Sequence, residues 1–596
     1  MRDRLMLQQV MNTQYKPTEA RALAEEAAIA ALLRCFCREV AAPCKKHGLS
    51  RPAILGPLPA VLNRVPWILH ITLSDRSVLM VGVEAIAPLH DYTCTTPVFR
   101  KVGRRFTAQT WEDVATIVYT ETATLSNASP NSEIMDQTRN SVAVTERLVA
   151  HRLSSPLPGM RDNEAVQTYF NSESNLLFGH PSHPTPKSRE GIDIDLLAHY
   201  APETRQSFDL HYVEVEPQFL WTYEVAAGTC NKFLEHAMPA ATPGASRIVI
   251  PVHPIQAQWL LHEPAVTRAF SEGWLRDLGI LAKPYRATSS VRTIINPHDL
   301  YFLKLSLHVR MTNCVRKNAA YELESAVAIT SWLNHDRATR EKQFPHLRVL
   351  GEPASYSIDA PHFDSNERQT LIEGFGTILR ESFLHSLDPG ETPLVAGGLF
   401  SSPVCGSNWL NHIVGTNDAD RLAWFDVYVT ALVPPILYCL FHEGIVFEPH
   451  LQNVVVGVVG KYPRTIYLRD LEGTKRTPRA RPLDSLGHAA RRSMEYTEDA
   501  GWQRVAYCLF VNHLGEAIRH LANGRDGLRT KLWHCVANTI ADYQREYGTI
   551  ESESRLLPLL KGGPLPAKTL LLTRFHQRPD REARSISVGN PMIFGG

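Results

Sequence analysis

The sequence predicts a multidomain α+β protein with a sheet-rich middle domain and a mostly helical C-terminal lobe. Its 596 residues exceed the ~250–300 residues over which one hydrophobic core usually grows, so we expect several domains. A hydrophobic share of 44% and a charged share of 21% are typical of a soluble globular chain. Strand-like segments concentrate in the middle of the chain and helical patterns dominate its last third, and this order gives the predicted class.

The first domain is predicted to span residues 1–155. Apolar residues at helical spacing predict a helix over 17–42, and strand-like runs follow between 67 and 81. The Ser/Asn/Pro-rich stretch 126–132 predicts a loop whose end caps a helix over 133–153. The SSPLPG segment that follows interrupts this pattern and marks the expected boundary.

The second domain is predicted to span residues 156–395. Residues 247–250 have a strand-like composition, and 286–295 with 300–312 read as two strands joined across an Asn-Pro-His-Asp turn. The Gly/Ser-rich stretch 395–408 lacks any periodicity and ends the domain.

The third domain, residues 396–596, is predicted to be mostly helical with one strand pair between 453 and 469. Its longest apolar run, Trp424 to Phe441, contains an Asp and a Pro-Pro pair. A membrane span needs about 20 nearly uninterrupted apolar residues. We therefore predict a buried, kinked helix here.

Charge and cysteine content exclude several classes of function. With 62 Lys+Arg against 61 Asp+Glu, the net charge of +1 provides no field that would attract nucleic acid or an anionic membrane. Ten cysteines are too few for a disulfide scaffold, and we expect Cys35, Cys37 and Cys44 to be free thiols in a buried helix rather than metal ligands. The N-terminus has no apolar segment of signal-peptide length, so we expect a cytoplasmic protein.

A first candidate site lies in the loop GHPSHPTPKSREG, residues 179–191. Its three prolines and two glycines exclude a regular helix and predict a stiff backbone. The loop carries His180, His183, Lys187 and Arg189, more anion-binding groups than a turn needs, so we predict a role in binding or catalysis. A plain surface turn and a zinc site at the two histidines are the alternatives.

A second candidate site is the segment ATSSVRT with the strand that contains Lys304. Hydroxyl side chains followed by Arg292 suit nucleotide phosphates. With a five-residue connection between the strands, Ser290 and Arg292 share the face of Lys304; with a four-residue connection, Ser289 and Thr293 do instead. The alternative is a strand pair with an ordinary polar outer face.

A third candidate site is HEGIVFEPHLQN, residues 442–453, with RDLEG at 469–473. An Asn after a helix and a later Asp before a Gly follow the order of the magnesium ligands in kinases. Asn453 and Asp470 are then the metal ligands, and Lys304 contacts the phosphates. The catalytic-loop Asp and the Gly-rich loop of kinases are missing, and His450 stands near the position of a base.

Together with HPIQAQW and KLSLHVRMTNCVR, these segments occur in an order that resembles the NRPS-independent siderophore synthetases of the aerobactin and achromobactin type. The resemblance runs from about residue 175 to 510. It implies thumb, fingers and palm domains, with a C-terminal lobe distantly similar to kinases, and a homodimer. It also implies Mg-ATP, which adenylates a carboxylate of citrate or a citrate derivative. Condensation with an amine or hydroxyl then gives an amide or ester, with release of AMP and pyrophosphate.

The resemblance also implies roles for individual residues. The catalytic set is Lys304, Arg316, His450 and His180. The ATP-binding set is Ser290, Arg292, Thr293, Lys304, Arg316, Gln452, Asn453 and Asp470. The substrate-binding set is His180, His183, Lys187, Thr312, Asn313, Arg316, His450, Arg504 and Tyr507, with the last two one helical turn apart. The metal-binding set is Asn453, Asp470 and Glu448.

Two other functions remain open from the sequence. A small-molecule kinase could use the same Lys304, Asn453 and Asp470. A ferric-siderophore binder or reductase is suggested by the C-terminal lobe, but an iron–sulfur reductase needs a terminal cysteine cluster, and only Cys535 follows Cys508. The acceptor, a small amine, an amino acid or another nucleophile, is not specified.

Overall fold

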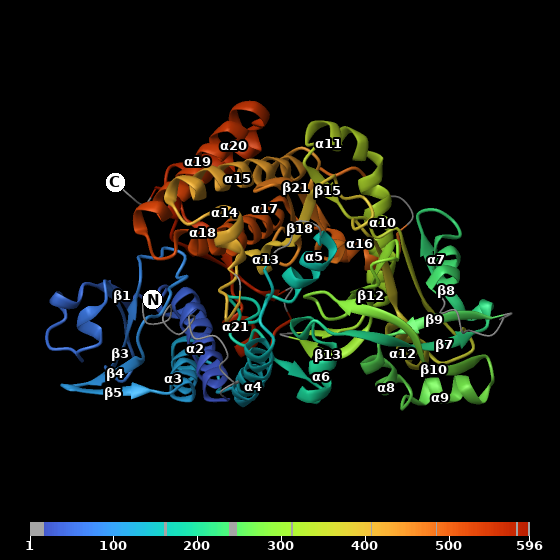
Figure 1. Ribbon diagram of the computed structural model, residues 1–596, viewed down its shortest axis with the longest axis horizontal. Coiled ribbons are helices and arrows are strands. Elements are labelled where there is room, and N and C mark those ends of the chain that lie inside the picture. The colour runs from blue at the N-terminus through green and yellow to red at the C-terminus, as the bar shows by residue number, and fades with distance from the viewer. Residues whose placement is uncertain are drawn as a thin grey trace.

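The computed structural model describes residues 17–159, 164–237, 247–311, 314–406, 408–483, 486–579 and 582–593. The N-terminal part lies on one side of the molecule and the sheet-rich middle on the other, while the C-terminal helices extend over both (Figure 1). The predicted α+β class, with its sheet-rich middle and helical C-terminal part, is confirmed at this level.

A helix and a five-stranded sheet form the N-terminal part. The helix α2 (Pro17–Phe36) continues into a π-helical turn, Cys37–Ala41, so the helix predicted over 17–42 is confirmed. The antiparallel strands follow one another in sequence order, and the runs predicted between 67 and 81 are two of them. The strands are β1 (His47–Ser50), β2 (Trp67–Thr72), β3 (Val78–Val83), β4 (Val98–Val102) and β5 (Arg105–Gln109).

The C-terminal region returns to this N-terminal part. The helices α3 (Trp111–Ser126) and α4 (Ser132–Ser154) pack with α2, and Leu571 and Phe575 from α21 (Leu571–Phe575) complete their hydrophobic cluster. The expected cap of the helix at 133–153 is wrong: the Asn131 side chain makes no capping bond, and its Nδ2 donates to the Phe575 carbonyl at 2.9 Å. Tertiary contact with the returning chain has replaced the local cap.

An eight-stranded antiparallel sheet forms the middle of the molecule. Its strand order is β8-β16-β17-β12-β11-β10-β7-β9, and β12 therefore lies near its centre. Helices α8 (Pro254–Leu260), α9 (Pro264–Ser271) and α12 (Ser365–Phe375) lie along it, with α10 (Ala320–His335) against β16 (Figure 1). The strands are β7 (Ser207–Val215), β8 (Leu220–Glu224), β9 (Ile248–Val252), β10 (Leu275–Ala287), β11 (Thr293–Ile295), β12 (Tyr301–Leu305), β16 (Ala354–Ile358) and β17 (Thr377–Glu381).

The strand pair around Lys304 is shorter than predicted. Residues 288–292 form a loop between β10 and β11, and the second strand breaks at Ser306. Beyond the break, β13 (Leu307–Met311) joins β14 (Cys314–Arg316) and β6 (Arg189–Glu190) in another sheet, so residues 300–312 do not form the single strand that was predicted. Thr293 pairs with Lys304, so these two residues share a face of the sheet, as the alternative with a four-residue connection predicted.

A four-stranded sheet and a long helix organise the C-terminal part. The sheet has the order β15-β21-β20-β18, and the predicted strand pair is confirmed as β20 and β21. Helix α15 (Asp418–Phe441) packs on β21, and 67% of the most apolar 18-residue stretch of this helix is buried. It is the one helix in the described residues that is long and apolar enough to cross a membrane. The strands are β15 (Leu347–Val349), β18 (Glu391–Val395), β20 (Val454–Val459) and β21 (Tyr462–Leu468).

Hydrophobic clusters cross the predicted domain limits at 155 and 395. Leu89, Leu157 and Ile329 belong to the same cluster as the core of α15, and α21 joins the N-terminal cluster. The limits therefore stay a prediction. All ten cysteines are free; Cys35 and Cys37 are buried as expected, whereas Cys44 is exposed.

Candidate functional site

The amino group of Lys304 lies between two carboxylates. Its Nζ is 2.6 Å from Asp470 Oδ1 and 2.7 Å from Glu472 Oε2. The side chain is 1% exposed because it projects from a central strand, and Asp470 and Glu472 follow β21 directly. The third and second candidate sites of the sequence thus meet at one point.

Two arginines complete this ion cluster. Arg292 is 2.9 Å from Glu472 Oε2, and Arg380 is 3.2 Å from Asp470 Oδ1 and 2.8 Å from the buried Glu352. Neither Arg380 nor Glu352 stands in a motif, and the sequence reading missed both. Arg380 lies on β17 and Glu352 just before β16. Their signal was a charged residue beside apolar neighbours, where burial without a partner is too costly.

Opposite charges fix the ionisation of the cluster. Burial raises the pKa of the Glu472 carboxyl, but Lys304 and Arg292 outweigh burial and hold that pKa at about 2. The same balance, with Lys304 and Arg380 as the cations, lowers the pKa of Asp470. Burial lowers the pKa of Lys304, and the two carboxylates outweigh it, so the net shift is upward. All three groups are charged at neutral pH.

The loop 288–293 presents its hydroxyls beside this cluster. Ser290 Oγ accepts the Thr293 N–H at 3.1 Å and lies 3.2 Å from Thr288 Oγ1. Val291 has φ +68°, a conformation that is rare for a β-branched residue and that only its surroundings can maintain. Arg292 donates to the Asn318 side-chain oxygen at 2.8 Å and to the Arg316 carbonyl at 3.1 Å, which ties the loop to β14.

The predicted metal ligands divide into two groups. Asn453 and Asp470 lie at the same end of the β20–β21 pair, because the Arg469 N–H donates to the Asn453 carbonyl at 3.0 Å. Their amide and carboxylate oxygens suit Mg²⁺. Glu448, by contrast, forms an ion pair with Arg504, and a Cβ on Gly473 would lie 2.4 Å from its Oε2. Among the described residues, no group of three or more His, Cys, Asp and Glu could hold a metal alone.

Two predicted histidines are neutral in this structure. Burial is the main cause that lowers the pKa of His180, to about 3, with His183 and His450 adding to it. His180 Nδ1 accepts the Ser182 N–H at 3.1 Å, and Nε2 lies 2.8 Å from the Asn512 amide. Burial also lowers the pKa of His450, which Glu448 and Asp470 partly offset. His183 is buried, and its Nδ1 accepts the Thr185 N–H at 3.1 Å.

The other predicted substrate-binding residues differ from one another in their burial and in their partners. Lys187 is 3% exposed and forms an ion pair with the equally buried Glu203. Arg504 donates to the Tyr496 hydroxyl at 2.6 Å. Tyr507 begins a π-helical segment, and its buried hydroxyl has no partner among the described residues.

The backbones of Arg316 and Gln452 lie beside the ion cluster. The Arg316 and Gln452 carbonyls accept from Arg292 and Arg469, respectively, and the Arg316 Nη2 is 3.4 Å from the Met311 carbonyl. Thr312 and Asn313 lie outside the described residues.

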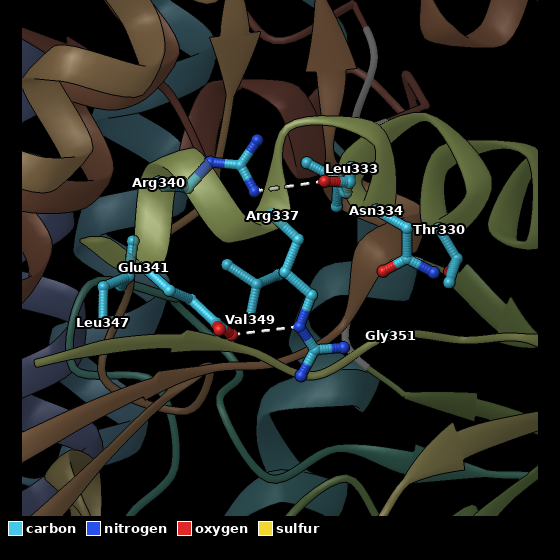
Figure 2. Close-up of a pocket in the computed structure, with 9 residues that line it drawn as sticks. All are labelled: Thr330, Leu333, Asn334, Arg337, Arg340, Glu341, Leu347, Val349 and Gly351. Carbon is cyan, nitrogen blue, oxygen red and sulfur yellow. Dashed lines mark hydrogen bonds and ion pairs between the residues drawn. The ribbon is translucent and has the colours of Figure 1, made fainter. Parts of the chain in front are cut away.

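A separate small pocket of about 20 Å³ is lined by α10, the following helix α11 (Arg337–Gln343) and β15 (Figure 2). None of the predicted site residues lines it. Arg337 pairs with Glu341 at 2.9 Å, and Arg340 pairs with Glu443 at 2.8 Å and donates to the Leu333 carbonyl at 3.3 Å. Since these charges already have partners, we assign this pocket no chemistry.

Comparison with known proteins gives two family matches. Residues 168–401 match the IucA/IucC family, and residues 422–583 match the family described as ferric iron reductase FhuF-like transporter. The second match covers the lobe for which a reductase was considered from the sequence.

Curated relatives and solved structures extend the match over most of the chain. The spermidine-citrate ligase of Bacillus anthracis is 28% identical, over 72% of this chain and 74% of its own. The L-2,3-diaminopropanoate–citrate ligase of Staphylococcus aureus is 27% identical, over 70% and 72%. The ATP-bound aerobactin synthetase IucA of Klebsiella pneumoniae, at 20% identity, superimposes with a TM-score of 0.82 over 96% of this chain and 100% of its own. Residues 168–401 therefore match the IucA/IucC family, and the chain as a whole has the fold of the ATP-bound aerobactin synthetase IucA.

Proposed function

We propose that this protein is an ATP-dependent siderophore synthetase. It adenylates a carboxylate of citrate or a citrate derivative and condenses it with an amine or hydroxyl, releasing AMP and pyrophosphate. The observation that supports this most is the buried Lys304 between Asp470 and Glu472, beside the hydroxyl-bearing loop, in a fold shared with an ATP-bound synthetase. Two relatives named as citrate ligases support the acyl donor and the amine acceptor.

In the ion cluster, cations and carboxylates balance each other before a nucleotide binds, and the cations are already in place for its phosphates. Lys304, Arg292 and Arg380 face Asp470, Glu472 and Glu352. Entering phosphates would compete with the carboxylates for the cations, and they would receive donors that are already oriented. Mg²⁺, when bound with ATP, would neutralise phosphate charge, and Asn453 and Asp470 would hold it.

The carboxylate substrate is proposed to bind between the loop 179–191 and the C-terminal lobe. Arg316 and Arg504 supply cations for citrate, and the neutral His180 and His450 supply hydrogen-bonding nitrogens. A neutral imidazole can accept a proton from the attacking amine, and His450 has no hydrogen-bond partner for its ring among the described residues. Roles of His183, Lys187, Thr312, Asn313 and Tyr507 in substrate binding, and of Glu448 in metal binding, are proposed on the resemblance alone.

The domain architecture is proposed to follow the same family. Residues 1–155 would be the thumb, 156–395 the fingers and 396–596 the palm, with the palm distantly similar to kinases. We further propose a homodimer in the cytoplasm.

Identifying the products of ATP turnover tests the proposal. Citrate with a panel of diamines, amino acids and amino alcohols should give AMP, pyrophosphate and a condensed product detectable by mass spectrometry. ADP with a phosphorylated substrate would instead support the kinase alternative. None of the relatives named above is named as a kinase. The reductase alternative predicts an iron–sulfur centre held by a terminal cysteine cluster, and only Cys535 follows Cys508.

A further inference from the structure

We propose that Glu173 is a positioning residue that holds three nucleotide-binding segments of this enzyme in one arrangement. The inference rests on the proposed function, since it concerns the geometry of the ATP site. Glu173 is the last residue of α5 (Ala165–Glu173), and it lies six residues before the loop 179–191. No motif contains it, and it makes no contact with Lys304, Asp470 or Glu472 among the described interactions.

The carboxylate of Glu173 is fully buried and receives four donors. Two come from the Arg469 guanidinium, with Nη2 at 3.1 Å. The Tyr169 hydroxyl donates at 2.5 Å and the Ser289 backbone N–H donates at 2.9 Å. Since Ser289 belongs to the hydroxyl-bearing loop and Arg469 precedes Asp470, one carboxylate joins two of the three segments directly.

Arg469 extends this connection to the third segment. Its Nε and Nη2 donate to the Gln452 carbonyl at 3.0 Å and 2.8 Å, and its backbone N–H donates to the Asn453 carbonyl at 3.0 Å. Nη2 also lies 3.3 Å from Ser289 Oγ. The Glu173–Arg469 pair thus links the segments 288–293, 450–453 and 469–472, which meet around the predicted phosphate site.

The charge of Glu173 has a second effect on Asp470. Arg469 is buried next to Asp470, and its guanidinium forms an ion pair with the buried Glu173. If Glu173 were neutral, this cation would have lost its partner, and Asp470 would be the neighbouring carboxylate available to it. Arg469 would then compete with Lys304 for Asp470. Glu173 therefore keeps Asp470 available to the nucleotide site as well as fixing the backbone around it.

Substitution of Glu173 by Gln tests this role, because it removes the charge and keeps the shape. In citrate-dependent pyrophosphate release, we expect Glu173→Gln to raise the KM for ATP at least 10-fold while the KM for citrate changes less than 2-fold. Glu173→Asp, which restores the charge, should bring the KM for ATP back to within about 3-fold of wild type. Tyr169→Phe, which removes one donor and keeps the ion pair, should raise the KM for ATP about 2- to 5-fold.

Glu443→Gln is the control, because it also breaks a Glu–Arg pair, that of the partly buried Glu443 with the buried Arg340. Glu443 belongs to none of the predicted catalytic, ATP-binding, substrate-binding or metal-binding sets. We expect it to lower the melting temperature and to leave both KM values within 2-fold of wild type. A folded Glu173→Gln protein with an unchanged KM for ATP, or with both KM values raised equally, would overturn the inference. If that variant does not fold, an unchanged KM for ATP in Tyr169→Phe overturns it instead.

Failure of the proposed function can be distinguished from failure of this inference. If the wild-type protein releases no pyrophosphate with citrate, the proposed function is wrong. ATP affinity measured by calorimetry then decides the inference, which predicts at least 10-fold weaker binding by Glu173→Gln than by wild type and by Glu443→Gln.

Discussion

Lys304 shows how much one side chain can depend on its partners. A lysine that is 1% exposed is rare unless its charge is paired, and here two carboxylates and a network of arginines make the burial possible. The same contacts make Lys304 both a structural residue and the proposed phosphate ligand. Its removal therefore affects stability as well as activity.

We predict that Lys304→Met lowers citrate-dependent pyrophosphate release at least 100-fold and also destabilises the protein. Two partly buried carboxylates lose their shared cation, and we expect a cost of about 3 kcal/mol, the lower end for breaking a buried ion pair. Urea unfolding measures the stability, and the pyrophosphate assay measures the activity. Glu472→Gln in the same background should recover part of the stability without recovering activity; no recovery would mean that the carboxylates are not the source of the loss.

At the same scale, the sequence predicted the kinds of residue in the site better than it predicted which residues contact one another. The hydroxyl loop, Lys304 and Asp470 were found because they stand in motifs with a definite order, and the structure brings them together. Glu173 and Arg380 were not found, because each acquires its partner only through tertiary folding, hundreds or tens of residues away. Lys187 and Glu448 were expected to face ligands, but each forms an ion pair, with partners 16 and 56 residues further along the chain.

At the scale of elements, strands were predicted correctly where local composition determines them. They were predicted wrongly where their limits depend on pairing within the sheet. The pair β20 and β21 follows from two apolar runs with a turn between them. The segment from 300 to 312 keeps its alternation in sequence, yet Ser306 leaves the sheet: its N–H and Oγ both bond to the Gly376 carbonyl. No local pattern announces such a change of partner sheet.

Glu39 gives a prediction at this scale. Its buried carboxylate accepts the backbone N–H groups of Leu570, Leu571 and Leu572, at 2.8–3.0 Å, and so caps α21 from the π-helical turn after α2. Glu39→Ala would leave three buried donors without an acceptor, at a cost of about 1–3 kcal/mol for each group that water cannot reach. We expect faster hydrogen exchange in residues 565–588 than in wild type, with the exchange of β20 and β21 unchanged. Equal acceleration in both regions would contradict a local anchoring role.

At the scale of the whole molecule, buried histidines predict a loss of stability in mild acid. Burial lowers the pKa of His90, His253 and His513 to about 3, so these rings stay neutral in the folded protein while they bind protons in the unfolded chain below pH ~6.5. Folding stability must therefore fall as the pH drops from about 6.5 towards 3, by up to ~1.4 kcal/mol per pH unit for each ring. Glu472, with its pKa of about 2, adds to the loss below pH ~4.5.

Urea midpoints measured between pH 7.5 and 5 should decrease steadily as the pH is lowered. Glu39 opposes this trend, because burial raises its pKa to about 7 and its protonation therefore favours the folded state in this range. The Glu39→Ala variant should thus show a steeper decrease than wild type. A midpoint that is independent of pH between 7 and 5 would mean that the three rings are not held neutral by the fold.

The return of α21 to the N-terminal cluster has a consequence for how the protein is made. Leu571 and Phe575 leave the ribosome roughly 440 residues after Ile134, with which they share a core. At about 5–20 residues per second, translation needs ~20–90 s to supply them. During that time the first five strands and their helices exist without two of the side chains that close their core. The N-terminal part of this protein can therefore be finished only when nearly all of the chain has been synthesised, and a stalled ribosome would leave it open to chaperones and proteases.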